Sequence, residues 1–408
     1  MTTAFVFAGG GSLGAVQIGA LRELVRAGER PDFVVGASVG ALNACFFAAR
    51  PDEEGIAALE QIWRDLKRRD VFPFTLGGAL QWLRGGDAIF ESKALRRLIE
   101  RRLPLHSLED ARLPVHVVAT DLAGASVCLS RGAAVDAVLA SAAIPIALPS
   151  VQIGMDHLMD GAIAGNTPIL TAAELGATRI IVLQTGYACS LAGPPKGAVA
   201  RGMHALTLLI SNQMERDLRL LDGKVAVHVA PHLCPLDVSP FNFEHSAELI
   251  ERSAQLTRLW LEEGGLGRCD APEAIRHDHA AMQASAPKAD GYDLVSYFDG
   301  QPRYGSAKWA VEHAGNMYHF ADAANRETFL TDPERYLPQY EGLCAFAMSR
   351  GKKVRGDPRS YRVVEGRLFF NLNASIHKQW ERDTTGNILR ADGHWRSLAD
   401  EAEQKDAS

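Results

Sequence analysis

The N-terminal part of the chain alternates between short apolar runs and amphipathic segments. The apolar run Phe5–Ala8 leads through the glycine-rich stretch Gly9–Gly14 into Ala15–Ala27, where apolar residues recur at helical spacing. A second run, Phe33–Val35, leads through a glycine-flanked serine into the small-residue segment Ala41–Ala49. Two successive units of strand, loop and helix predict a mainly parallel sheet covered by helices.

The alternation of apolar and amphipathic segments continues to about Glu263. Apolar residues at helical spacing predict that most of Asp52–Leu103 is helical. Such a stripe is typical of helices that face a core, and a cap over an active site that touches lipid is the alternative. Further strands are expected at Val115–Ala119, Val127–Leu129, Arg179–Gln184 and Val225–Pro231, with a hairpin leading to Leu158–Ala162 and helices at Val135–Ala140 and Ser246–Glu262.

A change of composition divides the chain after this region. Residues 265–290 are rich in Gly, Ala, His, Pro and Asp and have weak periodicity, which indicates a linker. We therefore expect a first α/β domain over residues 1–264 and an aromatic-rich second domain over residues 291–385. A polar tail over residues 386–408 is expected to fray. We find no internal repeat in the sequence.

Composition and charge narrow the class of protein. The 408 residues are enough for two domains with sizeable cores, and 47% of them are hydrophobic. A formal net charge of −6 argues against general nucleic-acid binding. The chain lacks a long apolar run and a basic leader, so we expect a cytoplasmic protein. The six cysteines are scattered without CxxC pairs, which disfavours a zinc ribbon or a disulfide framework.

The glycine-flanked serine is the first candidate for chemistry. Ser38 lies in Gly36-Ala37-Ser38-Val39-Gly40, directly after a predicted strand and before a predicted helix. Gly36 and Gly40 allow a sharp turn that exposes the hydroxyl, and the helix start favours a nearby anionic oxygen. This pattern predicts a nucleophile elbow, and an ordinary capping serine is the alternative.

The loop Gly9–Gly14 admits two interpretations. Its glycines satisfy the Gly-x-Gly-x-x-Gly pattern of dinucleotide-binding folds. That pattern expects an acidic residue at the end of the second strand, whereas Asp32 precedes the strand. The favoured interpretation is an oxyanion hole, because unobstructed amides can stabilise a developing negative charge. Gly10 and Gly11 are its expected donors, together with the amide of Val39.

The nucleophile requires a base, for which the sequence offers histidines and one aspartate. In the α/β-hydrolase order a histidine would follow the serine. Asp160 has the better setting, because Leu158-Met159 resembles a strand end and Gly161 permits close backbone approach. The downstream histidines are His204, His228, His232 and His245.

These motifs together carry a family resemblance. Gly9–Gly14, Gly36–Gly40 and Asp160–Ala162, in this order and spacing, resemble the bacterial patatin-like phospholipases. The segments Ser141–Pro145 and Asn166–Pro168 are also similar, and the likeness spans about residues 4–263. The resemblance implies a three-layer α/β/α domain with a Ser–Asp dyad and no catalytic histidine. Many members have Arg or Lys where Leu13 stands here.

The resemblance assigns roles to individual residues. Ser38 would be the nucleophile, Asp160 the base, and Gly9, Gly10, Gly11 and Gly14 the oxyanion loop. The implied activity is acyl-enzyme hydrolysis of phospholipid or other lipid esters, with no cofactor required. A thioesterase or short-chain carboxylesterase remains an alternative, as does a non-catalytic protein that binds a metal or a partner. The basic runs Arg64–Arg69 and Arg96–Arg102 are usual for solvated helix faces, and peripheral contact with an anionic membrane is the alternative.

The second domain carries a different resemblance. Gly291–Phe298, Gly315–Ala321, Asp332–Tyr336, Cys344–Ala347 and Phe369–Asn373 are similar to YHS domains, over about residues 291–382. The pattern predicts strands near Tyr304 and Met317–Phe320, helices at Ala323–Thr331 and around Cys344, and a hairpin with Glu365-Gly366 at its turn. YHS domains are often suggested to bind metal, which makes Cys344, His319 and His313 candidates. A lone cysteine in such a setting is usually a small buried hydrophobe.

Overall fold

The computed structural model describes residues 1–73, 88, 90–145, 147–186, 209, 212–233, 236, 238–267 and 287–406, without the side chains of 307 and 399–406. The chain forms two compact units, residues 1–282 and 283–408. Parts of the predicted helical stretch 52–103, most of the predicted linker and His204 lie outside the described residues. Within the described residues, no helix has both the length and the apolar character needed to cross a membrane.

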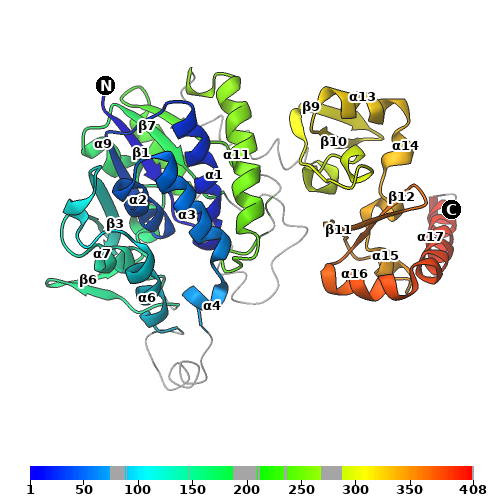
Figure 1. Ribbon diagram of the computed structural model, residues 1–408, viewed down its shortest axis with the longest axis horizontal. Coiled ribbons are helices and arrows are strands. Elements are labelled where there is room, and N and C mark those ends of the chain that lie inside the picture. Colours follow the sequence, from blue (N-terminus) through cyan, green and yellow to red (C-terminus); the bar gives the residue numbers. More distant parts are fainter. Residues whose placement is uncertain are drawn as a thin grey trace. The chain divides into compact units, whose positions relative to one another are not determined.

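The first unit is built on an eight-stranded mixed sheet in the order β5-β6-β3-β2-β1-β7-β8, with β4 paired to β3 (Figure 1). The strands β3, β2, β1, β7 and β8 run parallel, whereas β4, β5 and β6 add antiparallel pairs at one side. The strands are β1 (Thr3–Phe7), β2 (Phe33–Ala37), β3 (Val115–Asp121), β4 (Ser126–Leu129), β5 (Val151–Ile153), β6 (Asp156–Met159), β7 (Arg179–Leu183) and β8 (Ala226–Val229).

Helices cover both faces of this sheet, as the strand–loop–helix pattern predicts. Along β1, Phe5 and Phe7 pack into one apolar cluster, whereas Ala4 and Val6 pack into the other. The first cluster holds α1 (Gly14–Arg26), α2 (Val39–Ala49), α3 (Glu53–Asp65), α4 (Arg68–Val71), α6 (Lys93–Arg102), α7 (Ala134–Ser141) and α11 (Ser246–Glu262). The second cluster holds α9 (Ile169–Glu174) and the helical residues 212–221, and the short α8 is Ala162–Gly165. The predicted mainly parallel sheet in a three-layer α/β/α arrangement is therefore confirmed.

The second unit contains two short hairpins, each followed by a helix (Figure 1). Its elements are β9 (Ser306–His313), β10 (Asn316–Phe320), α13 (Ala323–Thr331), α14 (Pro333–Tyr336), α15 (Ala345–Met348), β11 (Asp357–Val364), β12 (Arg367–Asn371), α16 (Ala374–Trp380) and α17 (Thr384–Asp406). The predicted helix 323–331 and the hairpin turn at Glu365-Gly366 are present. The first hairpin pairs β9 with β10, so its first strand begins just after Tyr304.

These two hairpin–helix segments form an internal structural repeat that the sequence did not reveal. The elements β9, β10 and α13 begin at 306, 316 and 323, and β11, β12 and α16 begin at 357, 367 and 374, an offset of 51 residues. Each segment is preceded by three residues of positive φ, at Ala289–Gly291 and at Tyr340–Gly342. The expectation of no internal repeat is wrong for this unit.

The repeat extends to single hydrogen bonds. Asp293 Oδ2 accepts from the Ala321 amide at 2.9 Å, and Cys344 Sγ accepts from the Leu372 amide at 3.2 Å. Both acceptors occupy the same place in their copies, yet one is a carboxylate and the other a thiol. Few residues are identical between the two copies, so the repeat is not evident in the amino-acid sequence.

The C-terminal residues also differ from the prediction. The segment expected to fray as a polar tail forms most of α17. Ala391 on this helix is fully buried in an apolar cluster with Phe369 and Trp380, and Trp395 packs against the same cluster. A few apolar side chains at helical spacing therefore hold an otherwise polar helix in place.

Candidate active site

Ser38 lies on a strained turn between β2 and α2. Its backbone has φ 55° and ψ −127°, a region that side-chain-bearing residues rarely adopt. A Cβ added to Gly40 would lie 2.2 Å from the Phe7 carbonyl oxygen, so the tight turn requires glycine there. The predicted elbow geometry is thus present, with the serine at the carboxyl end of a central strand.

Asp160 reaches the same point from the antiparallel side of the sheet. It follows β6, and Thr120 on the neighbouring β3 donates its hydroxyl to the Asp160 carbonyl at 2.8 Å. A Cβ on Gly161 would lie 2.2 Å from the Val118 carbonyl oxygen, so the glycine lets this segment pass close to β3. The strand pairing therefore fixes the backbone that carries the carboxylate.

The two side chains meet directly. Ser38 Oγ donates to Asp160 Oδ2 at 2.7 Å, and the Ala162 amide donates to the other carboxylate oxygen at 2.8 Å. Ser38 and Asp160 are 5% and 3% exposed. Burial raises the pKa of Asp160 to about 6, although these two hydrogen bonds act in the opposite direction. The carboxylate is a stronger base than a solvated aspartate and is still mostly ionised at neutral pH.

The glycine loop offers two free amides. The Gly9 amide donates to the Asn166 carbonyl at 2.9 Å, and the Gly14 amide donates back to the loop as a helix cap. The amides of Gly10 and Gly11 have no hydrogen-bond partner among the residues that the structure describes. Of the four glycines expected to form the oxyanion hole, Gly10 and Gly11 are therefore the ones with amides available to a ligand.

A buried polar network, not foreseen from the sequence, anchors this loop. Gln17 donates to the carbonyls of Ala8 and Leu183 at 2.7 and 2.8 Å, and it accepts from Asn43 at 2.8 Å. Asn43 also donates to the Gly14 carbonyl at 3.1 Å and accepts from the Trp63 indole at 2.9 Å. Gln17 and Asn43 are both fully buried. The network ties both ends of the glycine loop to α1, α2 and α3.

Three further polar side chains position the serine turn and the loop. Ser141 Oγ accepts from the Ser38 amide at 2.8 Å and donates to the Val118 carbonyl at 2.5 Å. Thr185 donates to the Gly9 carbonyl at 2.7 Å, and the Asn166 side chain reaches the same carbonyl at 3.5 Å. Ser141 and Asn166 lie in the segments Ser141–Pro145 and Asn166–Pro168, which resemble the family. That resemblance is the sequence signal that could have identified these two residues.

The other predicted candidates lie elsewhere. His245 is one of the histidines considered as a base for Ser38. It pairs with Glu248 at the start of α11, whereas Ser38 Oγ is hydrogen-bonded to Asp160. Cys344 is buried at the start of α15, where its sulfur also accepts from the Ala347 amide at 3.4 Å. Over the described part of the chain, no three His, Cys, Asp or Glu side chains gather as a metal site requires, so Cys344, His319 and His313 form no such cluster there.

A serine on a strained strand-to-helix turn, a buried carboxylate partner and free loop amides are together typical of serine hydrolase domains. Residues 5–173 match the family model described as patatin-like phospholipase. Residues 5–173 of the first unit are therefore similar to the patatin-like phospholipases.

Two curated proteins are similar to part of this chain. The chain is 29% identical over 184 residues to a patatin-like phospholipase domain-containing protein of Caenorhabditis elegans, a match that covers 44% of this chain and 16% of the relative. It is 29% identical over 188 residues to human patatin-like phospholipase domain-containing protein 6, covering 45% of this chain and 13% of the relative. The chain thus matches less than a fifth of the length of either relative.

A solved structure is also similar. VipD from Legionella pneumophila aligns with 13% identity and a TM-score of 0.36, covering 81% of this chain and 80% of that one.

Proposed function

We propose that the first unit is a serine acyl hydrolase that cleaves phospholipid or other lipid esters. The observation that carries this proposal is the 2.7 Å hydrogen bond from Ser38 Oγ to a buried carboxylate, made at a strained turn beside free amides. The match of residues 5–173 to the patatin-like phospholipase model supports a lipid ester as the substrate class.

Acylation follows from the positions of three groups. Asp160 Oδ2 accepts the Ser38 proton as the hydroxyl oxygen attacks the ester carbonyl carbon. The carbonyl oxygen becomes an oxyanion, which the amides of Gly10 and Gly11 stabilise by hydrogen bonds. Collapse of this intermediate breaks the ester bond, the leaving alcohol takes the proton from Asp160, and an acyl-Ser38 ester remains.

Deacylation follows the same steps, with water as the nucleophile. Asp160, ionised again, removes a proton from a water molecule that attacks the acyl carbon. The same loop amides stabilise the second oxyanion. Its collapse releases the fatty acid and returns the proton to Ser38. A pKa of about 6 suits both directions, because the group can accept a proton near neutral pH and also give it up.

Covalent labelling with a fluorophosphonate tests this function in the full chain. The wild type should be labelled at Ser38, the Ser38→Ala variant should not, and Asp160→Asn should react about 10²–10⁴-fold more slowly because it lacks the base. Asp156→Asn, an exposed neighbour on β6, is the matched control and should react like the wild type. Equal labelling of wild type and Ser38→Ala would reject the assignment.

Hydrolysis assays with phospholipid vesicles and with a soluble short-chain ester then define the substrate class. Release of fatty acid from vesicles by the wild type, absent in Ser38→Ala, is the expected result. Turnover of the soluble ester without any turnover of phospholipid would reject the lipid substrate while retaining the hydrolase.

A further inference from the structure

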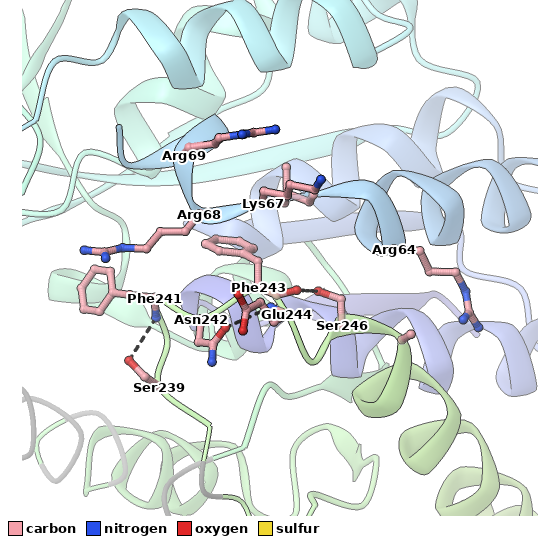
Figure 2. Close-up of a pocket in the computed structure, with 12 residues that line it drawn as sticks. Arg64, Lys67, Arg68, Arg69, Ser239, Phe241, Asn242, Phe243, Glu244 and Ser246 are labelled. Carbon is pink, nitrogen blue, oxygen red and sulfur yellow. Dashed lines mark hydrogen bonds between the residues drawn. The ribbon is translucent and has the colours of Figure 1, made fainter. Parts of the chain in front are cut away.

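A cation-lined cavity of about 980 Å³ lies between the end of α3, the short helix α4 and the segment that enters α11. Figure 2 shows basic side chains from one wall and the chain around Phe241 and Phe243 on the other. Its lining residues are Arg64, Leu66, Lys67, Arg68, Arg69, Ser239, Phe241, Asn242, Phe243, Glu244, Ser246 and Ala247.

The charge of this cavity is strongly positive. Lys67, Arg68 and Arg69 are exposed, and their side chains make no ion pair with any residue that the structure describes. Arg64 is already neutralised, because it pairs with Glu60 at 2.6 Å and with Glu251 at 2.5 Å. Glu244 is the one acidic residue among those lining the cavity. Three uncompensated cations around one hollow favour an anionic ligand.

The opposite wall combines aromatic surface with a link to the glycine loop. Phe241 is partly exposed and packs edge-on against Phe72, with 5.2 Å between ring centroids. Ser12 in the glycine loop donates its amide to the Pro240 carbonyl at 2.7 Å and its hydroxyl to the Ser239 carbonyl at 3.0 Å. The wall that lines the cavity is therefore hydrogen-bonded to the loop that faces Ser38.

We propose that this cavity binds the phosphate of an anionic phospholipid at a bilayer surface. The proposal rests on the hydrolase function, because the bound surface would present lipid esters beside the glycine loop. Arg and Lys recognise phosphate oxygens by charge-assisted hydrogen bonds, and Arg can do so in bidentate form. The cations are exposed and stand beside a partly exposed phenylalanine. That combination suits a headgroup layer above acyl chains better than an enclosed site for a free anion.

Vesicle co-sedimentation of the full chain tests the proposal. All proteins carry Ser38→Ala, so that hydrolysis does not alter the vesicles during the measurement. The cavity variant adds Lys67→Gln, Arg68→Gln and Arg69→Gln. The matched control adds Lys352→Gln, Lys353→Gln and Lys378→Gln, three exposed lysines of the second unit. The vesicles consist of phosphatidylcholine alone or of phosphatidylcholine with an equimolar amount of phosphatidylglycerol.

The parent protein should sediment with the anionic vesicles and much less with phosphatidylcholine alone. Each basic residue near an anionic surface contributes about fivefold, so the cavity variant should bind about a hundredfold more weakly. The control should bind like the parent, and circular dichroism and Tm should show that both variants are folded. Equal binding by the cavity variant and the parent would overturn the proposal.

Inorganic phosphate distinguishes a lipid headgroup from a free anion. At equal ionic strength, phosphate and chloride should reduce vesicle binding to the same extent. Selective displacement by phosphate, lost in the cavity variant, would overturn the lipid assignment in favour of a free phosphate site. These outcomes are independent of the hydrolase function, which fluorophosphonate labelling of Ser38 tests separately.

Discussion

Asp160 lies 122 positions after Ser38 in the chain, yet its carboxylate accepts the Ser38 hydroxyl at 2.7 Å. Both side chains are buried, and the carboxylate accepts one further hydrogen bond, from the Ala162 amide. A buried carboxylate with so few donors is costly to ionise, and that cost makes it basic. Activity and stability should both depend on how easily Asp160 ionises and on the groups that hold Ser38 and Asp160 in place.

Turnover should depend on the ionisation of Asp160. The pKa of this carboxyl is about 6, so the fraction able to accept a proton falls about tenfold for each pH unit below that value. The rate of fluorophosphonate labelling should therefore rise with pH and level off above an inflection near 6. A rate that does not change across this range would show that Asp160 is not the base.

Replacing Asp160 by asparagine should stabilise the protein while it slows the reaction at Ser38. The pKa of Asp160 is raised from 3.8 to about 6 in the folded state, so the folded protein binds its proton more tightly than the unfolded chain. Stability is then lost as pH rises from 3.8 to about 6, by about 3 kcal/mol in total. Asparagine carries no charge at any pH and avoids this loss.

Denaturant unfolding of wild type and Asp160→Asn over a pH series measures the effect. The difference in free energy of unfolding should be small near pH 3.8, should grow with pH, and should level off above about 6. Asp156→Asn, on the exposed part of the same strand, should change stability by less than about 0.5 kcal/mol. A pH-independent difference for Asp160→Asn would contradict the burial argument.

Gln17 should matter for both stability and turnover. Gln17→Leu removes the donors to the Ala8 and Leu183 carbonyls and the acceptor for Asn43, all in a fully buried setting. Unsatisfied buried polar groups cost about 1–3 kcal/mol each, so we expect a loss of about 3 kcal/mol after partial relaxation. Because the glycine loop loses its anchor, kcat for a soluble ester should fall more than KM changes.

Gln61→Leu is the matched control for this substitution. Gln61 is exposed on α3 and donates to Asp65 within the same helix. Its replacement should alter the free energy of unfolding by less than about 0.5 kcal/mol and leave kcat unchanged. Similar kinetics for the two leucine variants would show that Gln17 does not position the loop.

Gly40→Ala should prevent the nucleophile turn from forming. The new methyl group would lie 2.2 Å from the Phe7 carbonyl oxygen and 2.6 Å from that of Ala8, and both belong to the central strand region. We expect destabilisation above about 4 kcal/mol, measured as loss of folded protein and of labelling. Gly165→Ala meets no atom within 4 Å and should fold and react like the wild type. A stable, reactive Gly40→Ala protein would contradict the close approach of α2 to β1.

Local sequence patterns were sufficient for much of the first unit. The runs Phe5–Ala8 and Phe33–Val35 correspond to β1 and β2, and Ser246–Glu262 matches α11 at both ends. Glycine at 36 and 40 indicated the strained turn because only that residue fits there. Each of these features depends on neighbouring residues, and a short window of sequence contains the relevant information.

The second unit shows where local patterns fail. Its repeat is carried by backbone conformation and hydrogen-bond positions, so Asp293 and Cys344 occupy equivalent places without any likeness in chemistry. The helix α17 looked like a polar tail because its stabilising contacts come from Phe369 and Trp380 in other elements. In both cases the decisive contacts are made with other elements of the unit.

The sequence by itself determined the mainly parallel α/β architecture of the first unit, the serine turn and the glycine loop, because spacing and glycine placement encode them. The tertiary structure decided which groups meet at that turn. It brought Asp160 to Ser38 through the pairing of β6 with β3, and it connected Gln17 and Asn43 to the loop. It also gave Asp160 its basicity, because desolvation depends on the complete burial that only the folded chain provides.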